Sequence, residues 1–108
     1  MELCLVYMTA SSAEEAETIA EALVGERLAA CVNVIDGMRS TYRWEGAVQH
    51  DSETVVIAKT RRALVERLTA RVKALHSYSC PCVVALPIVG GNPDFLSWIE
   101  EETEETIG

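Results

Sequence analysis

Two cysteines that flank a proline, Cys80 and Cys82, are the residues whose types and spacing most directly suggest chemistry. On an extended segment, residues two apart point to the same side, so both thiols could face one ligand. His76, four positions before Cys80, could complete a three-ligand site of the soft kind that suits Cu(I) or Zn(II). The alternatives are a redox pair, which would be strained at this spacing, and apolar packing at a strand entrance. The stretch is a candidate metal site, and apolar packing is the simpler interpretation.

Cys31 is a further candidate ligand, because it lies in the strand-like run of residues 29–35. A thiolate there would suit a soft metal ion, whereas a packed core thiol is the simpler interpretation. The cysteines at positions 4, 31, 80 and 82 lack the paired spacing of a zinc finger. The first residues are unlike a secretory signal, so we expect reduced thiols and a cytoplasmic location. From the residues alone, Cu(I) or Zn(II) is a possible ligand, and no metal ion is expected to be required for folding.

The elements that must position these side chains follow from the periodicity of the chain. Residues 3–8 are apolar throughout and predict a buried strand. Ser11 with Glu14, or Ser12 with Glu15, can form a capping box at the start of the helix that follows. Apolar residues then recur at helical spacing, with glutamates on the other side. A strand followed by an amphipathic helix is therefore expected.

The middle of the chain predicts a long hairpin. Residues 29–35 and 38–45 both predict extended chain. In the second stretch, uncharged side chains alternate with mostly charged ones, which is the period of a half-buried strand. Between them, Asp36 and Gly37 form either a tight turn or a bulge inside one very long strand, and the sequence leaves both open. The polar residues within 46–51 predict the turn that leads into the returning strand.

The last third of the chain predicts two helices and one strand. Thr60 can cap a helix whose apolar stripe runs over residues 64–75. Residues 82–89 predict a strand, and Pro87 places it at a sheet edge or a break in pairing, because proline lacks the amide hydrogen. Asn92 and the proline after it predict the start of the third helix.

The order of these elements predicts a single-domain α+β protein covering residues 1–108. It corresponds to a ferredoxin-like βαββαβ sandwich with an extra C-terminal helix and a long hairpin of the second and third strands. Residues 55–58 and 83–86 are apolar on both sides, which requires both sheet faces to be buried. Two helices can cover only one face. We therefore expect oligomerisation through the open sheet face.

Charge and motif content restrict the function. The formal net charge of −8 opposes binding to nucleic acid or to anionic membrane surfaces. No apolar run approaches the roughly 20 residues of a membrane helix. No nucleophile has an evident activating partner, and no phosphate-binding glycine loop of the Walker type is present. The sequence therefore predicts a binding protein rather than an enzyme.

Several segments, read together, resemble the CutA family, the divalent-cation tolerance proteins. They are ERLAACVN at residues 26–33, STYRWEG at 40–46, Lys59-Thr60, HSYSCP at 76–81, ALPI at 85–88, Gly91-Asn92 and Trp98-Ile99. The resemblance implies a ferredoxin-like protomer in a tight homotrimer, with the hairpin strands pairing between subunits. It also implies a role in tolerance of copper and other divalent metals, no established catalytic reaction, and a structural likeness to the trimeric PII signalling proteins.

The chain departs from the family pattern in the cysteine segment. Ser77 stands where members usually have proline, and Cys82 stands where they commonly have glutamate. The resemblance implies that Cys31 corresponds to a cysteine implicated in copper binding in some members. Two other cysteines implicated there correspond to Met8 and Arg71. A thioether at Met8 could still bind Cu(I), whereas Arg71 could not act as a ligand.

A second candidate site is a cleft between subunits, lined by residues from the resembling segments and by one acid: Tyr42, Trp44, Glu53, Lys59 and Tyr78. Small-molecule sites often form in such clefts. Interface packing of the rings, with a surface ion pair between Lys59 and Glu53, explains the same residues without a ligand. The main hypothesis is a copper-binding, metal-tolerance trimer. The alternatives are a PII-like sensor of a small anionic ligand and a structural trimer that organises a partner.

Overall fold

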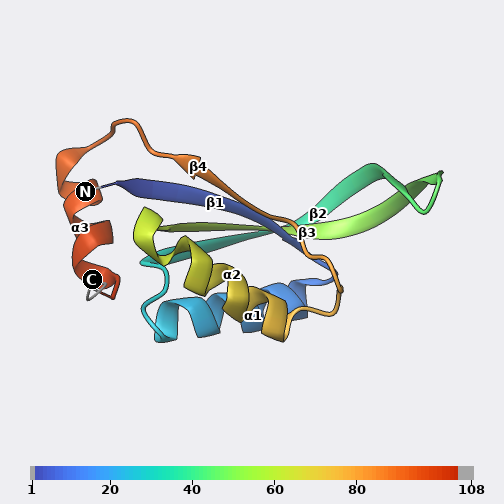
Figure 1. Cartoon of the computed structure of the whole chain (residues 1–108), viewed down its shortest axis with the longest axis horizontal. Coiled ribbons are helices and arrows are strands. Elements are labelled where there is room, and N and C mark those ends of the chain that lie inside the picture. Colours follow the sequence, from blue (N-terminus) through green and yellow to red (C-terminus); the bar gives the residue numbers. More distant parts are fainter. Residues whose placement is uncertain (1, 105–108) are drawn as a thin grey trace.

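The structure, a computed structural model, describes residues 2–104 and has the predicted ferredoxin-like arrangement. The strands form one antiparallel sheet in the order β2-β3-β1-β4. Helices α1 and α2 lie against one face, and α3 lies at the end of the sheet opposite the projecting hairpin (Figure 1). In chain order the elements are β1 (Leu3–Ala10), α1 (Ala13–Gly25), β2 (Cys31–Trp44), β3 (Ala47–Arg61), a 3-10 turn (Arg62–Leu64), α2 (Val65–Leu75), β4 (Val83–Pro87) and α3 (Pro93–Glu102).

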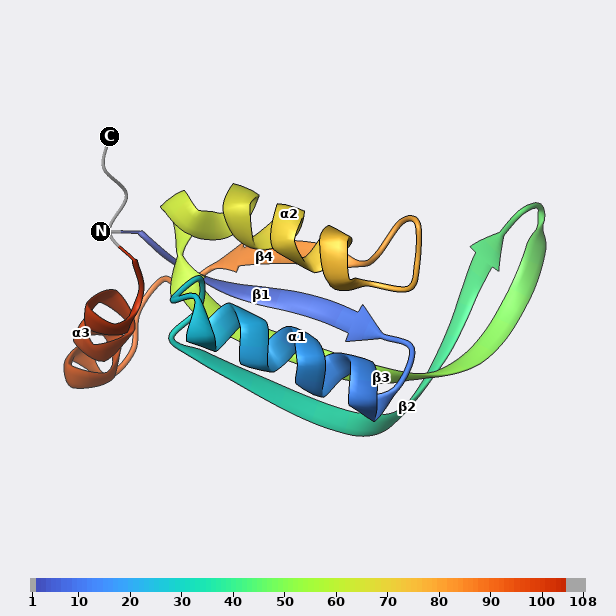
Figure 2. The same cartoon turned by 90° about the horizontal axis from the view of Figure 1, so that it is seen from below.

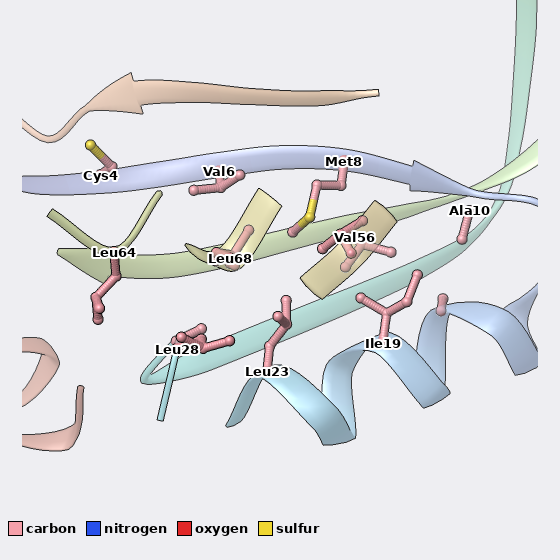
Figure 3. Packing of buried hydrophobic residues seen from close by; sticks show 14 residues of the cluster. Cys4, Val6, Met8, Ala10, Ile19, Leu23, Leu28, Val56, Leu64 and Leu68 are labelled. Carbon is pink, nitrogen blue, oxygen red and sulfur yellow. The ribbon is translucent and has the colours of Figure 1, made fainter. Parts of the chain in front are cut away.

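The core lies between the sheet and the two long helices. Alternation along the central strands turns Val6 and Met8 of β1, and Val56 of β3, toward the helices, where each is at most 1% exposed. Ile19 of α1 and Leu68 of α2 meet them from the other side (Figure 3). Full burial of such side chains contributes about 1.5–3 kcal/mol each, so this layer holds the helices on the sheet.

The start of α1 confirms the predicted Ser12 cap, but the reciprocal bond from Glu15 goes to the residue before the cap. The hydroxyl of Ser12 accepts a hydrogen bond from the backbone N–H of Glu15 (3.1 Å). The carboxylate of Glu15 reaches back to the backbone N–H of Ser11 (3.0 Å). Two backbone N–H groups thereby gain acceptors: that of Glu15 in the first turn of α1, and that of Ser11 just before the helix.

The predicted cap at Thr60 is wrong. Thr60 is the next-to-last residue of β3, and its hydroxyl donates to the carbonyl of Leu28 (2.7 Å). The chain then passes through the 3-10 turn, and α2 starts without a side-chain cap. Pairing of Thr60 with Cys4 and of Arg61 with Leu3 of β1 extends β3 to Arg61 and therefore outweighs the local capping preference.

The second and third strands form the long hairpin, and the Asp36-Gly37 ambiguity resolves as a bulge. The register passes from Ile35 opposite Val55 to Met38 opposite Glu53, so β2 holds one extra residue at this point. Gly37 has a φ of +82°, and the carboxylate of Asp36 accepts from the backbone N–H of Gly37 (2.8 Å).

The bulge changes which side chains of β2 share a face. Before it, the odd-numbered residues point away from the helices; after it, Met38, Ser40, Tyr42 and Trp44 do so. These strand ends project beyond the rest of the sheet as an arm (Figure 2). The predicted turn at residues 46–51 is mostly wrong, because the chain reverses at Glu45 and Gly46 and His50 pairs with Thr41 in the arm.

Replacing Gly37 by alanine is expected to destabilise the protein by about 1–2 kcal/mol, because a Cβ is strained at this positive φ. Space is not the cause, since a Cβ at Gly37 would meet nothing within 4 Å. Gly25 is the matched control: it closes α1, has no positive φ, and should gain stability as alanine. Urea unfolding of both variants measures the difference, and equal shifts would contradict the role of the bulge.

The sheet face opposite α1 and α2 carries exposed apolar side chains. Ile35, Val84 and Leu86 are 54%, 52% and 47% exposed. Pro87 lies in β4, an outer strand, which confirms its predicted place at a sheet edge. Phe95 of α3 is also exposed, at 42%. Within residues 2–104, none of the helices has the length and hydropathy needed to span a bilayer.

Candidate functional site

A cleft of about 610 Å³ opens on the exposed sheet face, where the arm leaves the sheet beside the segment that joins α2 to β4. Its lining is rich in aromatic rings and sulfur atoms: Tyr7, Tyr42, Trp44 and Tyr78, with Met38, Cys80 and Cys82. Among the lining residues that the structure describes, Glu53 is the one that carries a charge. The cleft therefore combines an aromatic wall, soft donors and one carboxylate.

Two elements far apart in the sequence build one wall of this cleft. Tyr7 lies on the open face of β1, and its hydroxyl donates to the sulfur of Met38 on β2 (3.4 Å). The bulge at Gly37 is what turns Met38 to this face. Tyr42 and Trp44 follow at the spacing of two and continue the wall along the arm.

Both outer tyrosines of the cleft donate to carboxylates. The hydroxyl of Tyr78 donates to Glu53 (3.3 Å), and that of Tyr42 donates to Asp51. The hydrogen bond to Asp51 raises the pKa of Tyr42 to about 12. Burial and the charge of Glu53 raise the pKa of Tyr78. Both phenols therefore stay protonated at neutral pH.

Titration of Tyr42 is expected to show a midpoint near pH 12 instead of 10.0. Because the folded-state pKa is the higher one, the stabilisation is complete below about pH 10 and is lost as the pH rises toward about 12. The tyrosinate absorbance of the wild type minus that of Tyr42→Phe isolates this group. Asp51→Asn should return the midpoint toward the ordinary value, and an unchanged midpoint would contradict the assignment.

His76 anchors the segment that carries Tyr78, and its side chain is fully buried. Nε2 lies 2.7 Å from the carbonyl oxygen of Thr9, and Nδ1 accepts from the backbone N–H of Tyr78 (3.0 Å). A carbonyl can only accept, so the neutral imidazole with its hydrogen on Nε2 satisfies both contacts. Both ring nitrogens are thus engaged, and a metal ion would have to displace one of these partners.

Glu15 supports the same segment from the start of α1. Its carboxylate accepts from the backbone N–H of Ser77 (2.9 Å) and lies 3.5 Å from Nδ1 of His76. Burial alone would raise the pKa of Glu15, but hydrogen bonds from Ser11 and Ser77 bring it below the ordinary value. The carboxylate is therefore charged at neutral pH and holds the segment against α1.

Cys31 and Lys59 lie outside the cleft, opposite each other at the start of β2 and the end of β3. The ammonium of Lys59 donates to Asn33 and lies 3.8 Å from the sulfur of Cys31. The predicted ion pair between Lys59 and Glu53 is therefore replaced by these contacts. Lys59 is half-buried beside them.

The structure brings together most of the predicted cleft and only part of the predicted metal set. Between residues 2 and 104, no three histidine, cysteine or carboxylate side chains are placed to hold a metal ion. The ligand roles of Cys31, His76, Cys80 and Cys82 stay predictions. Sequence reasoning missed Tyr7 and Met38, although the alternation of Met38 with Tyr42 was a usable signal for Met38.

Comparisons with known proteins agree with this architecture. The family model described as CutA1 divalent ion tolerance protein matches residues 4–102. The divalent-cation tolerance protein CutA of Thermus thermophilus is 50% identical over 99 residues, which cover 92% of this chain and 96% of that protein. The chloroplastic protein CutA 1 of Oryza sativa is 46% identical over 102 residues; these cover 94% of this chain but only 58% of that longer protein.

Solved structures give the same result. The crystal structure of CutA1 from Oryza sativa superposes with a TM-score of 0.95 at 44% identity, covering 98% of this chain and 97% of that one. The divalent cation tolerance protein from Thermus thermophilus superposes with a TM-score of 0.93 at 49% identity, covering 94% and 99%. This chain therefore belongs to the CutA1 family of divalent ion tolerance proteins.

Proposed function

We propose that this protein serves divalent-cation tolerance by binding a thiophilic metal ion, with copper as the first candidate, and that it does so as a homotrimer without catalysing a reaction. The observation that carries the metal proposal is that Cys80, Cys82 and Met38 line one cleft. Thiolate and thioether sulfur are the ligands that Cu(I) prefers. The remaining coordination positions are left to a second subunit or to solvent.

Metal binding in the cleft requires a thiol to lose its proton. Burial, and then the charge of Glu53, raise the pKa of Cys82. A metal ion binds the thiolate and must therefore displace this proton. The thiols must also be reduced, which goes with a cytosolic location.

The open sheet face supports the proposed trimer. Ile35, Val84 and Leu86 are about half exposed there, and a second copy would remove them from water. β2 and β4 are the outer strands of the sheet, so each offers an edge for pairing between subunits. Cys31 and Lys59 lie on this same face, so a second copy covering the face would also contact them.

Cu(I) titration of the reduced protein against a competing chelator tests the metal proposal. The double variant Cys80→Ser/Cys82→Ser is expected to lower the affinity at least about tenfold, because it removes both thiolates from the cleft. Cys31→Ser is the matched control and should bind as the wild type does. Equal affinity of the wild type and the double variant, at unchanged oligomeric mass, would reject the cleft thiols as ligands.

A further inference from the structure

We propose that the arms of neighbouring subunits meet face to face in the trimer, so that Arg39 and Arg43 of one arm bind the acidic and aromatic face of the next arm. The proposal rests on the proposed trimer and goes beyond it, because it names the side chains through which the arms meet. The arm comprises residues 38–53 and projects beyond the rest of the sheet (Figure 2). The helices of the same chain do not extend along it, so its two faces are available to other copies of the chain.

One face of the arm is acidic and aromatic. Because directly opposite residues of paired strands point to the same side, the register places four such side chains on this face: Tyr42, Trp44, Asp51 and Glu53. The strand residues of the arm, 38–44 and 47–53, contribute no lysine, arginine or histidine to it. An arginine suits such a surface, because its planar guanidinium stacks on a ring and donates hydrogen bonds to a carboxylate. This acidic face is therefore complementary to arginine.

The opposite face of the arm is basic. Arg39, Arg43 and His50 lie on it, and the strands of the arm contribute no carboxylate to it. The residues opposite the two arginines are Ser52 and Val48, which carry no charge. Within residues 2–104, neither arginine forms an ion pair with its own chain. The positive charge of this basic face is therefore not neutralised by the described part of the same chain.

The separation of the two charges onto opposite faces distinguishes between kinds of assembly. In a twofold dimer the same surface of both subunits meets, so acid would face acid or base would face base. In a ring of three, each contact joins two different surfaces of neighbouring subunits. The acidic face of one arm can then meet the basic face of the next, and this contact repeats around the ring. The charges of the arm therefore favour a contact between unlike faces, as a cyclic trimer requires.

The spacing of the charges favours a second arm as the occupant. Arg39 and Arg43 are four positions apart, which is about 13 Å along an extended strand. A small anion bridges such a distance poorly. On the acidic face, Asp51 lies opposite Ser40, so Asp51 and Trp44 are also four positions apart along the arm. One basic face can therefore place one arginine at a carboxylate and the other on an aromatic ring of the next arm.

Chemical cross-linking tests this contact at the level of single residues. Arg43→Lys keeps the positive charge and supplies an amine, which a carbodiimide joins to a carboxylate in direct contact. Mass spectrometry of the two-chain product is expected to find position 43 linked to Asp51 or Glu53 of a second chain. Arg62→Lys is the matched control, since Arg62 pairs with Glu2 of its own chain at 2.8 Å and should give links within one chain. The wild type gives the background from the native lysines.

Links from position 43 only to its own chain, in a preparation that light scattering shows to be trimeric, would overturn the proposal and leave the trimer standing. A wild-type mass of one chain would reject both this contact and the trimer on which it rests. The copper titration does not enter either result. Failure of the arm contact, of the trimer and of metal binding can therefore be told apart.

Charge reversal gives a second, independent readout. Arg39→Glu/Arg43→Glu places acid against acid and is expected to speed subunit exchange between labelled and unlabelled trimers at least about tenfold. Adding Asp51→Lys/Glu53→Lys to the same chain reverses both faces, restores opposite charges and should return the rate to within about threefold of the wild type. Glu14→Lys/Glu17→Lys, at exposed positions of α1, is the control and should leave the rate unchanged. Equal rates for the wild type and Arg39→Glu/Arg43→Glu would overturn the proposal.

Discussion

Replacing Val84 and Leu86 by arginine is expected to convert the proposed trimer into a monomer. Both residues lie on β4, on the open sheet face, and are 52% and 47% exposed in the single chain. Each would bury an apolar side chain in the proposed interface, whereas an arginine there would place an unpaired charge in an apolar contact. The substitutions touch neither the helix-facing core nor the cleft lining, so the fold should persist.

Light scattering measures this outcome directly. The wild type should have about three times the 11.8 kDa mass of one chain, and the double variant should have the mass of one chain. Thr18→Arg/Val24→Arg is the matched control, since it adds the same charge at exposed positions of α1. A wild type of 11.8 kDa, or a double variant that stays trimeric, would exclude the open face as the interface.

Replacing Arg61 by leucine is expected to lower the free energy of unfolding by about 3 kcal/mol. Arg61 is 8% exposed at the end of β3. Its Nε donates to the hydroxyl of Thr103 (2.8 Å), and its Nη2 donates to the carbonyl of Glu100. Leucine would leave the hydroxyl of Thr103 and the carbonyl of Glu100, at the end of α3, without the charged donor that they share. α3 should therefore loosen from the sheet before the rest of the protein unfolds.

The neighbouring arginine provides the control for this prediction. Arg62 pairs with Glu2 at 2.8 Å, but their side chains are 68% and 72% exposed. Solvent screens such a pair, so Arg62→Leu should cost less than about 1 kcal/mol. Urea unfolding followed by circular dichroism compares the two variants, with Trp98 emission reporting on α3. Equal losses of stability would contradict the role assigned to Arg61.

Much of the fold could be predicted from the sequence because its determinants are local. The spacing of apolar residues located α1 and α2, and the serine-glutamate pair at 12 and 15 located the start of α1. Asn92 caps α3 by accepting from the N–H of Asp94, as expected. The bulge was one of two open alternatives because only the register with β3 distinguishes it from a turn.

Only part of the candidate site could be predicted from the sequence. The rest depends on contacts between residues that lie far apart in the chain. The carbonyl that holds His76 belongs to Thr9, 67 positions away, and nothing in the local sequence indicates this pairing. Cys31 and Cys80 looked equivalent as soft ligands, but strand pairing places Cys31 opposite Lys59 and away from the cleft. His50 was assigned to a turn because the arm is exposed on both faces. Its strands are therefore polar on both faces, as a loop is.

The bulge at Gly37 also decides the sign of the charge that the cleft presents. If β2 alternated regularly through this point, Arg39 and Arg43 would point to the cleft, and Tyr42 would point to the opposite face. The cleft would then attract anions rather than cations. One residue in a left-handed backbone conformation thus selects between two opposite electrostatic surfaces encoded in the same strand.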